Sequence, residues 1–128
     1  MNAFDDYNAK KDLINFVDVV NKVSRERKIS RAEVCRKLGK TENDYEEAGK
    51  KLEKEGVYVA YYGYLERVVY KPKEQFWYGI FILPNVIEPI GFGGATYTEA
   101  LKNFSLCIDE NAEGPGPYND DCDHETAD

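Results

Sequence analysis

The stretch from Ile29 to Tyr70 constrains the fold of this 128-residue chain more than any other part of it. Ile29 stands alone between two predicted helices, which is typical of a very short strand. Residues 30–33 then read Ser-Arg-Ala-Glu, a capping box that begins a helix. Gly39 and Gly56 mark two helix ends, because glycine adopts the left-handed backbone conformation at no steric cost. The predicted order is a short strand, a helix, a turn, a second helix and then aromatic strands.

A long helix is predicted before this stretch, from about Asn8 to Arg27. Its apolar residues recur at helical spacing and form one stripe. Basic residues gather near its C-terminal end, where the helix dipole favours cations. Thr41 is predicted to cap the later helix that ends before Gly56.

Aromatic and β-branched residues after Gly56 predict a β-hairpin. Alternation indicates one strand over residues 57–65, with Gly63 as a bulge, and a returning strand over residues 76–83. Residues 71–74 read Lys-Pro-Lys-Glu, a good turn, so residues 66–74 are the expected tip of the hairpin. Both faces of the first strand are partly apolar, so both could be covered.

The region after the hairpin is predicted to be a loop followed by a last helix. Residues 85–95 contain two prolines and the run Gly91-Phe92-Gly93-Gly94. This run could cradle a phosphate with backbone amides, but it lacks the Gly-x-Gly-x-x-Gly spacing, and a flexible connector is the preferred interpretation. Thr96, with Glu99 three residues later, is predicted to cap the helix.

Charge is distributed unevenly along the chain. The formal net charge is −7, yet from Asp109 onward there are eight acidic residues and no Lys or Arg. The rest of the chain therefore has 16 of the 24 acidic residues and all 17 basic residues, and is nearly neutral. Residues 110–128 also contain Gly-Pro-Gly-Pro and lack periodicity, which predicts a disordered acidic tail after a single domain of residues 1–109. The expected fold class is α+β, with three helices, an aromatic β-hairpin, an extra C-terminal helix and this tail.

No catalytic, metal or cofactor site is predicted. The one histidine, His124, lies in the predicted tail, so the folded part has no histidine to act as a general base. The three cysteines, Cys35, Cys107 and Cys122, lack metal-motif spacing, and the tail acids lack the spacing of a calcium-binding loop. Free thiols, the absence of a signal-peptide pattern and the absence of a long apolar run predict a cytoplasmic protein without a membrane partner.

Residues 8–83 resemble the winged-helix superfamily in the order of their elements. The resemblance is carried by the runs at residues 29–34 (Ile-Ser-Arg-Ala-Glu-Val), 38–39 (Leu-Gly) and 52–57 (Leu-Glu-Lys-Glu-Gly-Val). It implies a helix-turn-helix whose third helix and wing face a ligand, and it identifies a fold better than a function. A transcriptional regulator of this kind, binding duplex DNA as a dimer, would place these basic residues on phosphates: Arg31, Arg36, Lys40, Arg67 and Lys71.

Residues 84–108 are similar to the strand–loop–helix signature of HicB-type antitoxins. The similarity rests on Pro84, Gly91, Gly94 and the run Thr96-Tyr97-Thr98-Glu99-Ala100-Leu101-Lys102-Asn103. Proteins of that family neutralise a small basic toxin by protein contact. The resemblance therefore implies a protein partner rather than a substrate.

The helix that would enter DNA in a winged helix begins with the acidic residues Glu42, Asp44, Glu46 and Glu47. Carboxylates oppose phosphate, whereas cations supply much of the affinity of DNA-binding proteins. These acids either complement the helix dipole or meet a basic partner, because complementary charge speeds encounter and rejects wrong partners. The predicted function is a small non-catalytic regulator that binds a protein, in the manner of a phage-type or antitoxin-type inhibitor.

Tyrosines crowd the two predicted strands. Most belong to the core or to half-buried sheet surface, but tyrosine is also enriched at protein interfaces. Tyr58, Tyr62 and Tyr64 are the candidates for partner contact. A side of the sheet that no helix covers would serve a homodimer or a partner protein.

Overall fold

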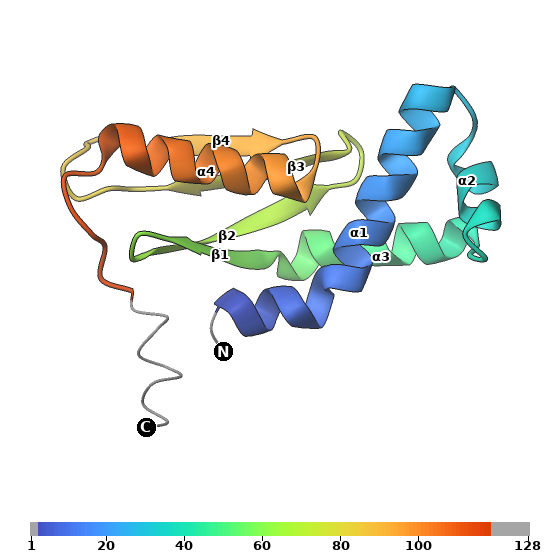
Figure 1. Cartoon of the computed structure of the whole chain (residues 1–128), viewed down its shortest axis with the longest axis horizontal. Helices are drawn as coiled ribbons and strands as arrows, with labels where there is room; N and C mark the ends of the chain where they lie inside the picture. The colour runs from blue at the N-terminus through green and yellow to red at the C-terminus, as the bar shows by residue number, and fades with distance from the viewer. Residues whose placement is uncertain (1–2, 119–128) are drawn as a thin grey trace.

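The computed structural model describes residues 3–118, which form four helices and a four-stranded antiparallel sheet (Figure 1). The helices are α1 (Ala3–Arg27), α2 (Arg31–Lys37), α3 (Glu42–Glu55) and α4 (Tyr97–Asn111). The strands are β1 (Val57–Tyr61), β2 (Tyr64–Lys71), β3 (Phe76–Phe81) and β4 (Ile90–Gly94). They pair in chain order, which confirms the α+β class. Among residues 3–118, no helix is long and apolar enough to span a bilayer.

Helix α1 begins at Ala3, earlier than the predicted Asn8, because its first turn is tied to the sheet. The buried carboxylate of Asp6 accepts a hydrogen bond from the Tyr58 N–H (2.8 Å) and pairs with the Lys10 ammonium (2.9 Å). The Lys10 ammonium also donates to the Gly56 carbonyl (2.9 Å). These bonds hold the start of α1 against the junction of α3 and β1.

The predicted N-cap residues, Ser30 of α2 and Thr41 of α3, are confirmed. The Ser30 hydroxyl accepts from the Glu33 N–H (3.1 Å), and Thr41 and Asp44 form a reciprocal capping box. Gly39 has a φ of 75°, as a helix-ending glycine requires. The short strand predicted at Ile29 does not form, because no strand lies beside it; the Ile29 carbonyl accepts from the Ser24 hydroxyl (2.6 Å) instead.

The predicted hairpin is wrong in its boundaries. Tyr62 and Gly63 have φ values of 51° and 81° and form a two-residue turn between the paired residues Tyr61 and Tyr64. The chain therefore reverses at Gly63 instead of bulging there. Residues 66–71, predicted at the tip of the wing, belong to β2, and the next turn lies at residues 72–75.

The glycine run predicted as a connector forms strand β4, so the sheet has four strands and not two. Tyr78 pairs with Gly93, and the aromatic side chains of β3 occupy the space above the glycines. A Cβ added to Gly93 would lie 2.6 Å from Cε2 of Phe76, and one added to Gly91 would lie 3.4 Å from the Tyr78 hydroxyl. Glycine is thus required at Gly93 by a ring on the neighbouring strand, whereas the contact at Gly91 is an ordinary van der Waals distance. At Gly94 the start of α4 excludes a side chain, since an added Cβ would lie 2.5 Å from Cβ of Glu99.

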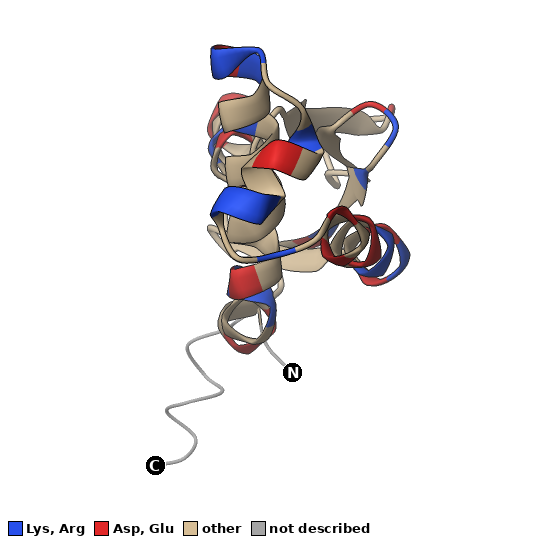
Figure 2. Cartoon of the chain, turned by 90° about the vertical axis from the view of Figure 1, so that its right-hand side faces the viewer, with Lys and Arg blue, Asp and Glu red and all other residues tan. Residues whose placement is uncertain are grey.

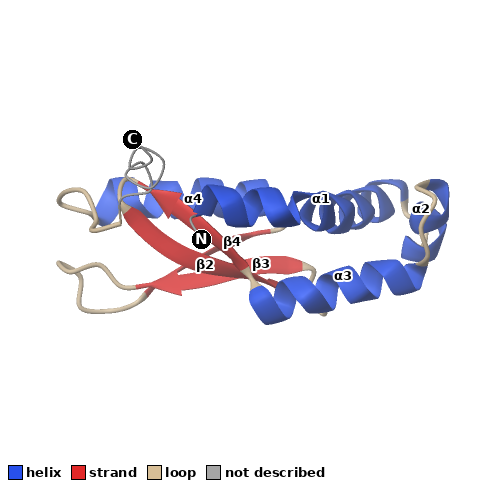
Figure 3. Ribbon diagram, turned by 90° about the horizontal axis from the view of Figure 1, so that it is seen from below, coloured by secondary structure: helices blue, strands red, loops and turns tan. Residues whose placement is uncertain are grey.

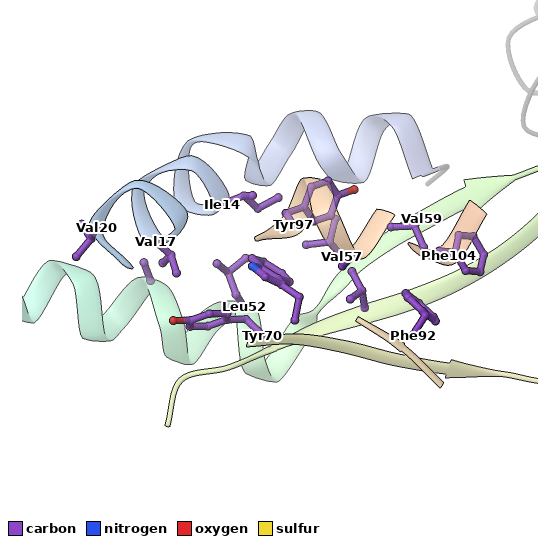
Figure 4. Close-up of a cluster of buried hydrophobic side chains, with 14 of the residues drawn as sticks. Ile14, Val17, Val20, Leu52, Val57, Val59, Tyr70, Phe92, Tyr97 and Phe104 are labelled. Atoms are coloured by element: carbon purple, nitrogen blue, oxygen red, sulfur yellow. The ribbon is translucent and has the colours of Figure 1, made fainter. Parts of the chain in front are cut away.

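The core lies between one face of the sheet and helices α1, α3 and α4 (Figures 3 and 4). Phe104 of α4 is fully buried and packs against Phe92 and Phe81, with ring centroids 4.8 and 5.2 Å away. Ala100, Phe104 and Ile108 are the fully buried residues of α4, and they recur at helical spacing. Trp77 lies in the same layer, beneath α1 and the start of α4.

Residues 112–118 are attached to the turn between β1 and β2. The Gly116 N–H donates to the Tyr62 carbonyl (2.9 Å), and the Tyr118 N–H donates to the Gly63 carbonyl (2.7 Å). Disorder was predicted from residue 110 onward; residues 110–111 instead complete α4, and residues 112–118 make these defined contacts. Residues 119–128, which hold the other acids of the predicted tail, lie outside the described residues.

Substitution Gly116→Ala is expected to weaken this attachment. An added Cβ would lie 2.7 Å from Cδ1 of Tyr64 and would press on the Gly63 backbone. We expect the free energy of unfolding to fall by about 1 kcal/mol in urea denaturation, as overpacking predicts. Gly114→Ala is the matched control, because its Cβ would meet nothing within 4 Å. Equal effects of the two substitutions would contradict the attachment.

Candidate functional site

One face of the sheet is covered by α1 and α4, and the opposite face has no helix over its exposed strand positions (Figure 3). We call this second surface the open face. It is defined by alternate residues of the four strands: Tyr58, Ala60, Leu65, Arg67, Val69, Lys71, Phe76, Tyr78, Ile80, Gly91 and Gly93.

Large apolar side chains of the open face are in contact with solvent. Tyr58 and Tyr78 are 38% and 40% exposed, and Ile80 is 50% exposed. A hollow of about 430 Å³ lies between strands β1, β2 and β3 on this side. Burial of apolar surface is worth about 25 cal/mol per Å², so covering these three side chains would favour the binding of a partner.

The charged residues of the open face are both cationic. Arg67 lies opposite Tyr58 in the sheet register, and Lys71 lies opposite Phe76. The Arg67 guanidinium reaches back to the Glu55 carbonyl (3.5 Å). Glu66 contributes to the hollow, and burial raises the pKa of its carboxyl above the ordinary value. The surface therefore combines apolar contact area with two cations and one partly buried carboxyl group at the hollow.

The three predicted contact tyrosines lie in different environments. Tyr58 belongs to the open face, whereas Tyr62 lies in the turn between β1 and β2 and is 55% exposed. Tyr64 is half-buried, and its hydroxyl donates to the Gly114 carbonyl (2.7 Å). The structure thus brings only Tyr58 of these three onto the open face.

The predicted acidic contacts are all exposed at the start of α3 (Figure 2). Asp44 is committed to the capping box, and its hydrogen bond from the Thr41 backbone lowers the pKa of its carboxyl. Glu46 and Glu47 are followed one helical turn later by the exposed residues Lys50 and Lys51. The exposed side of α3 therefore carries mixed charge beyond its first turn.

The basic residues predicted to contact DNA lie on separate elements. Arg31 lines a cleft with Lys73 between α3 and the turn after β2, and its guanidinium carbon is 5.3 Å from the centroid of the Tyr45 ring. Arg36 and Lys40 are exposed at and after the end of α2. Arg67 and Lys71 belong to β2 and to the open face. They do not form one surface made of a wing and a second helix.

Sequence reasoning missed Phe76, Tyr78 and Ile80 as surface residues. Residues 76–83 are apolar on both sides of the strand, so alternation could not distinguish the covered face from the open one. The glycines of β4 are the sequence feature that could have revealed the fourth strand, because glycine within a strand marks the close approach of another group.

Scans of protein-family models and searches of curated proteins and of solved structures return no match to this chain. The winged-helix and HicB resemblances therefore stay predictions.

Proposed function

We propose that this chain is a non-catalytic regulatory protein that binds a partner protein through the open face. The observation that carries the proposal is the exposure of Tyr58, Tyr78 and Ile80 on a sheet face whose charged residues are both cationic. Aromatic and apolar anchors surrounded by charge are typical of protein interfaces. An inhibitor of the antitoxin type is the specific form that the HicB resemblance favours.

The dimensions of the open face favour a single segment of a partner. Strands of five to eight residues, spaced about 4.8 Å apart, give a surface of roughly 15 by 20 Å. An amphipathic helix of about four turns covers such a surface. A second copy of the chain would need about 800 Å² on each side for a stable complex, which exceeds this footprint.

Charge on the open face indicates the sign of the charge that the partner segment should carry. Acidic residues beside the apolar stripe of a partner helix would meet Arg67 and Lys71. This proposal keeps the protein partner predicted from the sequence and moves the principal contact from the acidic start of α3 to the sheet. Asp44 is less suited to partner contact because it already caps its own helix.

A displayed library of amphipathic helical peptides, with acidic or basic residues on the polar side, tests the proposal. We expect the acidic peptides to be enriched, and we expect Ile80→Asp to weaken the selected peptide at least tenfold in titration calorimetry. Leu106→Asp is the matched control, because Leu106 is 43% exposed on α4, on the covered side of the sheet. Enrichment of basic peptides, or equal binding by both variants, would contradict the proposal.

Sedimentation of the unliganded protein tests the homodimer predicted as an alternative. We expect a monomer at micromolar concentration because the open face is small. A dimer that Ile80→Asp dissociates would show that the open face serves self-association instead.

A further inference from the structure

A second surface, unrelated to the open face, carries a concentrated positive charge. Residues 22–40 contain eight Lys or Arg residues and two glutamates, a net charge of +6 in a chain whose total is −7. The fold places the end of α1 and the whole of α2 together at one end of the molecule (Figures 1 and 2). We call this surface the basic end; its cations are Lys22, Arg25, Arg27, Lys28, Arg31, Arg36, Lys37 and Lys40.

Most of this charge is not neutralised by the protein. All of these cations except Arg31 are exposed. Within residues 3–118, the ion pair found at the basic end joins Arg36 to Glu33 at 3.9 Å, a long distance between two solvated groups. The helix dipole accounts for Arg25 and Arg27 in the last turn of α1 and for Arg36 and Lys37 in the last turn of α2. It does not account for the other four cations: Lys22, Lys28, Arg31 and Lys40.

We propose that the basic end binds the phosphate backbone of duplex nucleic acid. Cations that face phosphates supply affinity without any apolar anchor, because binding releases counterions from the duplex. A protein partner would need an apolar centre, whereas the large apolar side chains exposed here are limited, among the described residues, to Val19 and Leu38.

Two other anionic ligands fit the basic end less well. Single strands bind through rings that stack on bases, and the exposed aromatic residues described in this chain lie outside residues 19–40. Membrane surfaces are bound by helices that insert an apolar side, but the apolar stripe of α1 is buried in the core at Ile14, Val17 and Val20. Duplex phosphate remains as the ligand that needs only exposed cations.

The acidic start of α3 determines how a duplex can approach. Glu42 and Asp44 follow the basic end directly, so an approach along the first turn of α3, as in a helix-turn-helix, would bring phosphates against carboxylates. The last turn of α1, with Arg25 and Arg27, lies apart from that turn (Figure 2), whereas the end of α2 leads directly into it. Lys40 is near enough to Asp44 to contribute to the lowered pKa of its carboxyl. At 0.1 M salt the screening length is about 10 Å, so more distant acids contribute little repulsion.

Fluorescence anisotropy with a labelled random duplex of about 30 base pairs measures this binding across a salt series. Contacts to about four phosphates would weaken binding roughly 150-fold between 50 and 200 mM salt. The test variant carries Lys22→Gln, Arg27→Gln and Lys37→Gln, and the matched control carries Lys50→Gln, Lys51→Gln and Lys54→Gln on α3. We expect the test variant to bind at least tenfold more weakly at 50 mM salt, with a flatter salt slope, and the control to change less than twofold.

Several results would overturn the proposal. The wild-type chain would fail to bind at 25 mM salt, or the two triple variants would lose affinity equally, which would indicate a response to net charge alone. More effective displacement of the duplex by polyglutamate, a single strand or phosphatidylserine vesicles than by unlabelled duplex would assign the surface to another partner class. Ile80→Asp should bind duplex like the wild type, so failure at the open face and failure at the basic end are distinguishable.

Discussion

Replacing Phe104 with alanine is expected to lower the free energy of unfolding by about 3–5 kcal/mol, the cost typical of a large cavity at a buried phenylalanine. Phe104 is fully buried and is the residue through which α4 contacts the rings of Phe81 and Phe92. A domain of this size is stable by about 5–15 kcal/mol, so this single change removes a large fraction of the total. Guanidinium denaturation followed by the fluorescence of Trp77, the one tryptophan of the chain, measures the loss.

Leu106→Ala on the same helix controls for the loss of apolar volume. Leu106 is 43% exposed, so its truncation should cost less than about 1 kcal/mol. If the two substitutions cost the same, α4 is not anchored through the phenylalanine cluster. The covered face of the sheet would then need another explanation for its burial.

Asp18→Ala is expected to lower the free energy of unfolding by about 2–4 kcal/mol, because it strands two buried donors. One carboxylate oxygen of Asp18 accepts from the Trp77 indole N–H and the other from the Tyr97 N–H, both at 2.8 Å. Asp18 thus joins α1 to β3 and to the first residue of α4. Thermal unfolding of the wild type, Asp18→Ala and Asp18→Asn measures the effect.

The asparagine variant should be intermediate in stability, since its side chain has one acceptor oxygen for the two donors. A loss below about 1 kcal/mol for the alanine variant would show that water replaces the carboxylate at both donors. The two helices and the strand that meet at Asp18 (α1, α4 and β3) would then be held by apolar packing alone.

Titration of Asp18 gives this site a defined pH dependence. Burial raises the pKa of its carboxyl above the ordinary 3.8, so the folded state binds the proton more tightly than the unfolded state does. The resulting stabilisation is fully present below the unfolded pKa and is lost as pH rises through the folded pKa. We expect the difference in unfolding free energy between the wild type and Asp18→Asn to become less favourable to the wild type as pH rises from the unfolded to the folded pKa of Asp18. Denaturation of both proteins from pH 3 upward measures this difference. An advantage that grows with pH would contradict the raised pKa.

Local signals in the sequence predicted the helices well. Thr41 with Asp44 and Thr96 with Glu99 act within one turn, so their effect does not depend on the rest of the fold. The start of α1 was placed too late because Asp6 is stabilised by a strand that lies 52 residues further along the chain. Contacts of that range leave no periodic pattern near the residue itself.

The sheet was less predictable because its signals are not local. Tyrosine is uncommon at a position with positive φ, so Tyr62-Gly63 did not indicate a hairpin turn. The glycines of β4 are typical of a flexible run in the sequence, but in the structure Phe76 occupies the space beside Gly93 and the start of α4 occupies the space beside Gly94. The basic end was visible as a run of charge, but its role as a surface depends on α1 and α2 meeting at one end of the molecule.

The attachment of residues 112–118 brings the two ends of the described chain together. The Ala3 N–H donates to the Tyr118 hydroxyl at 3.2 Å. A short linker between these positions would allow circular permutation, with new termini in the loop at residues 84–89. Such a permutant would present fusion partners or labels from the loop that connects β3 to β4, because the linker would join the original ends near Ala3 and Tyr118.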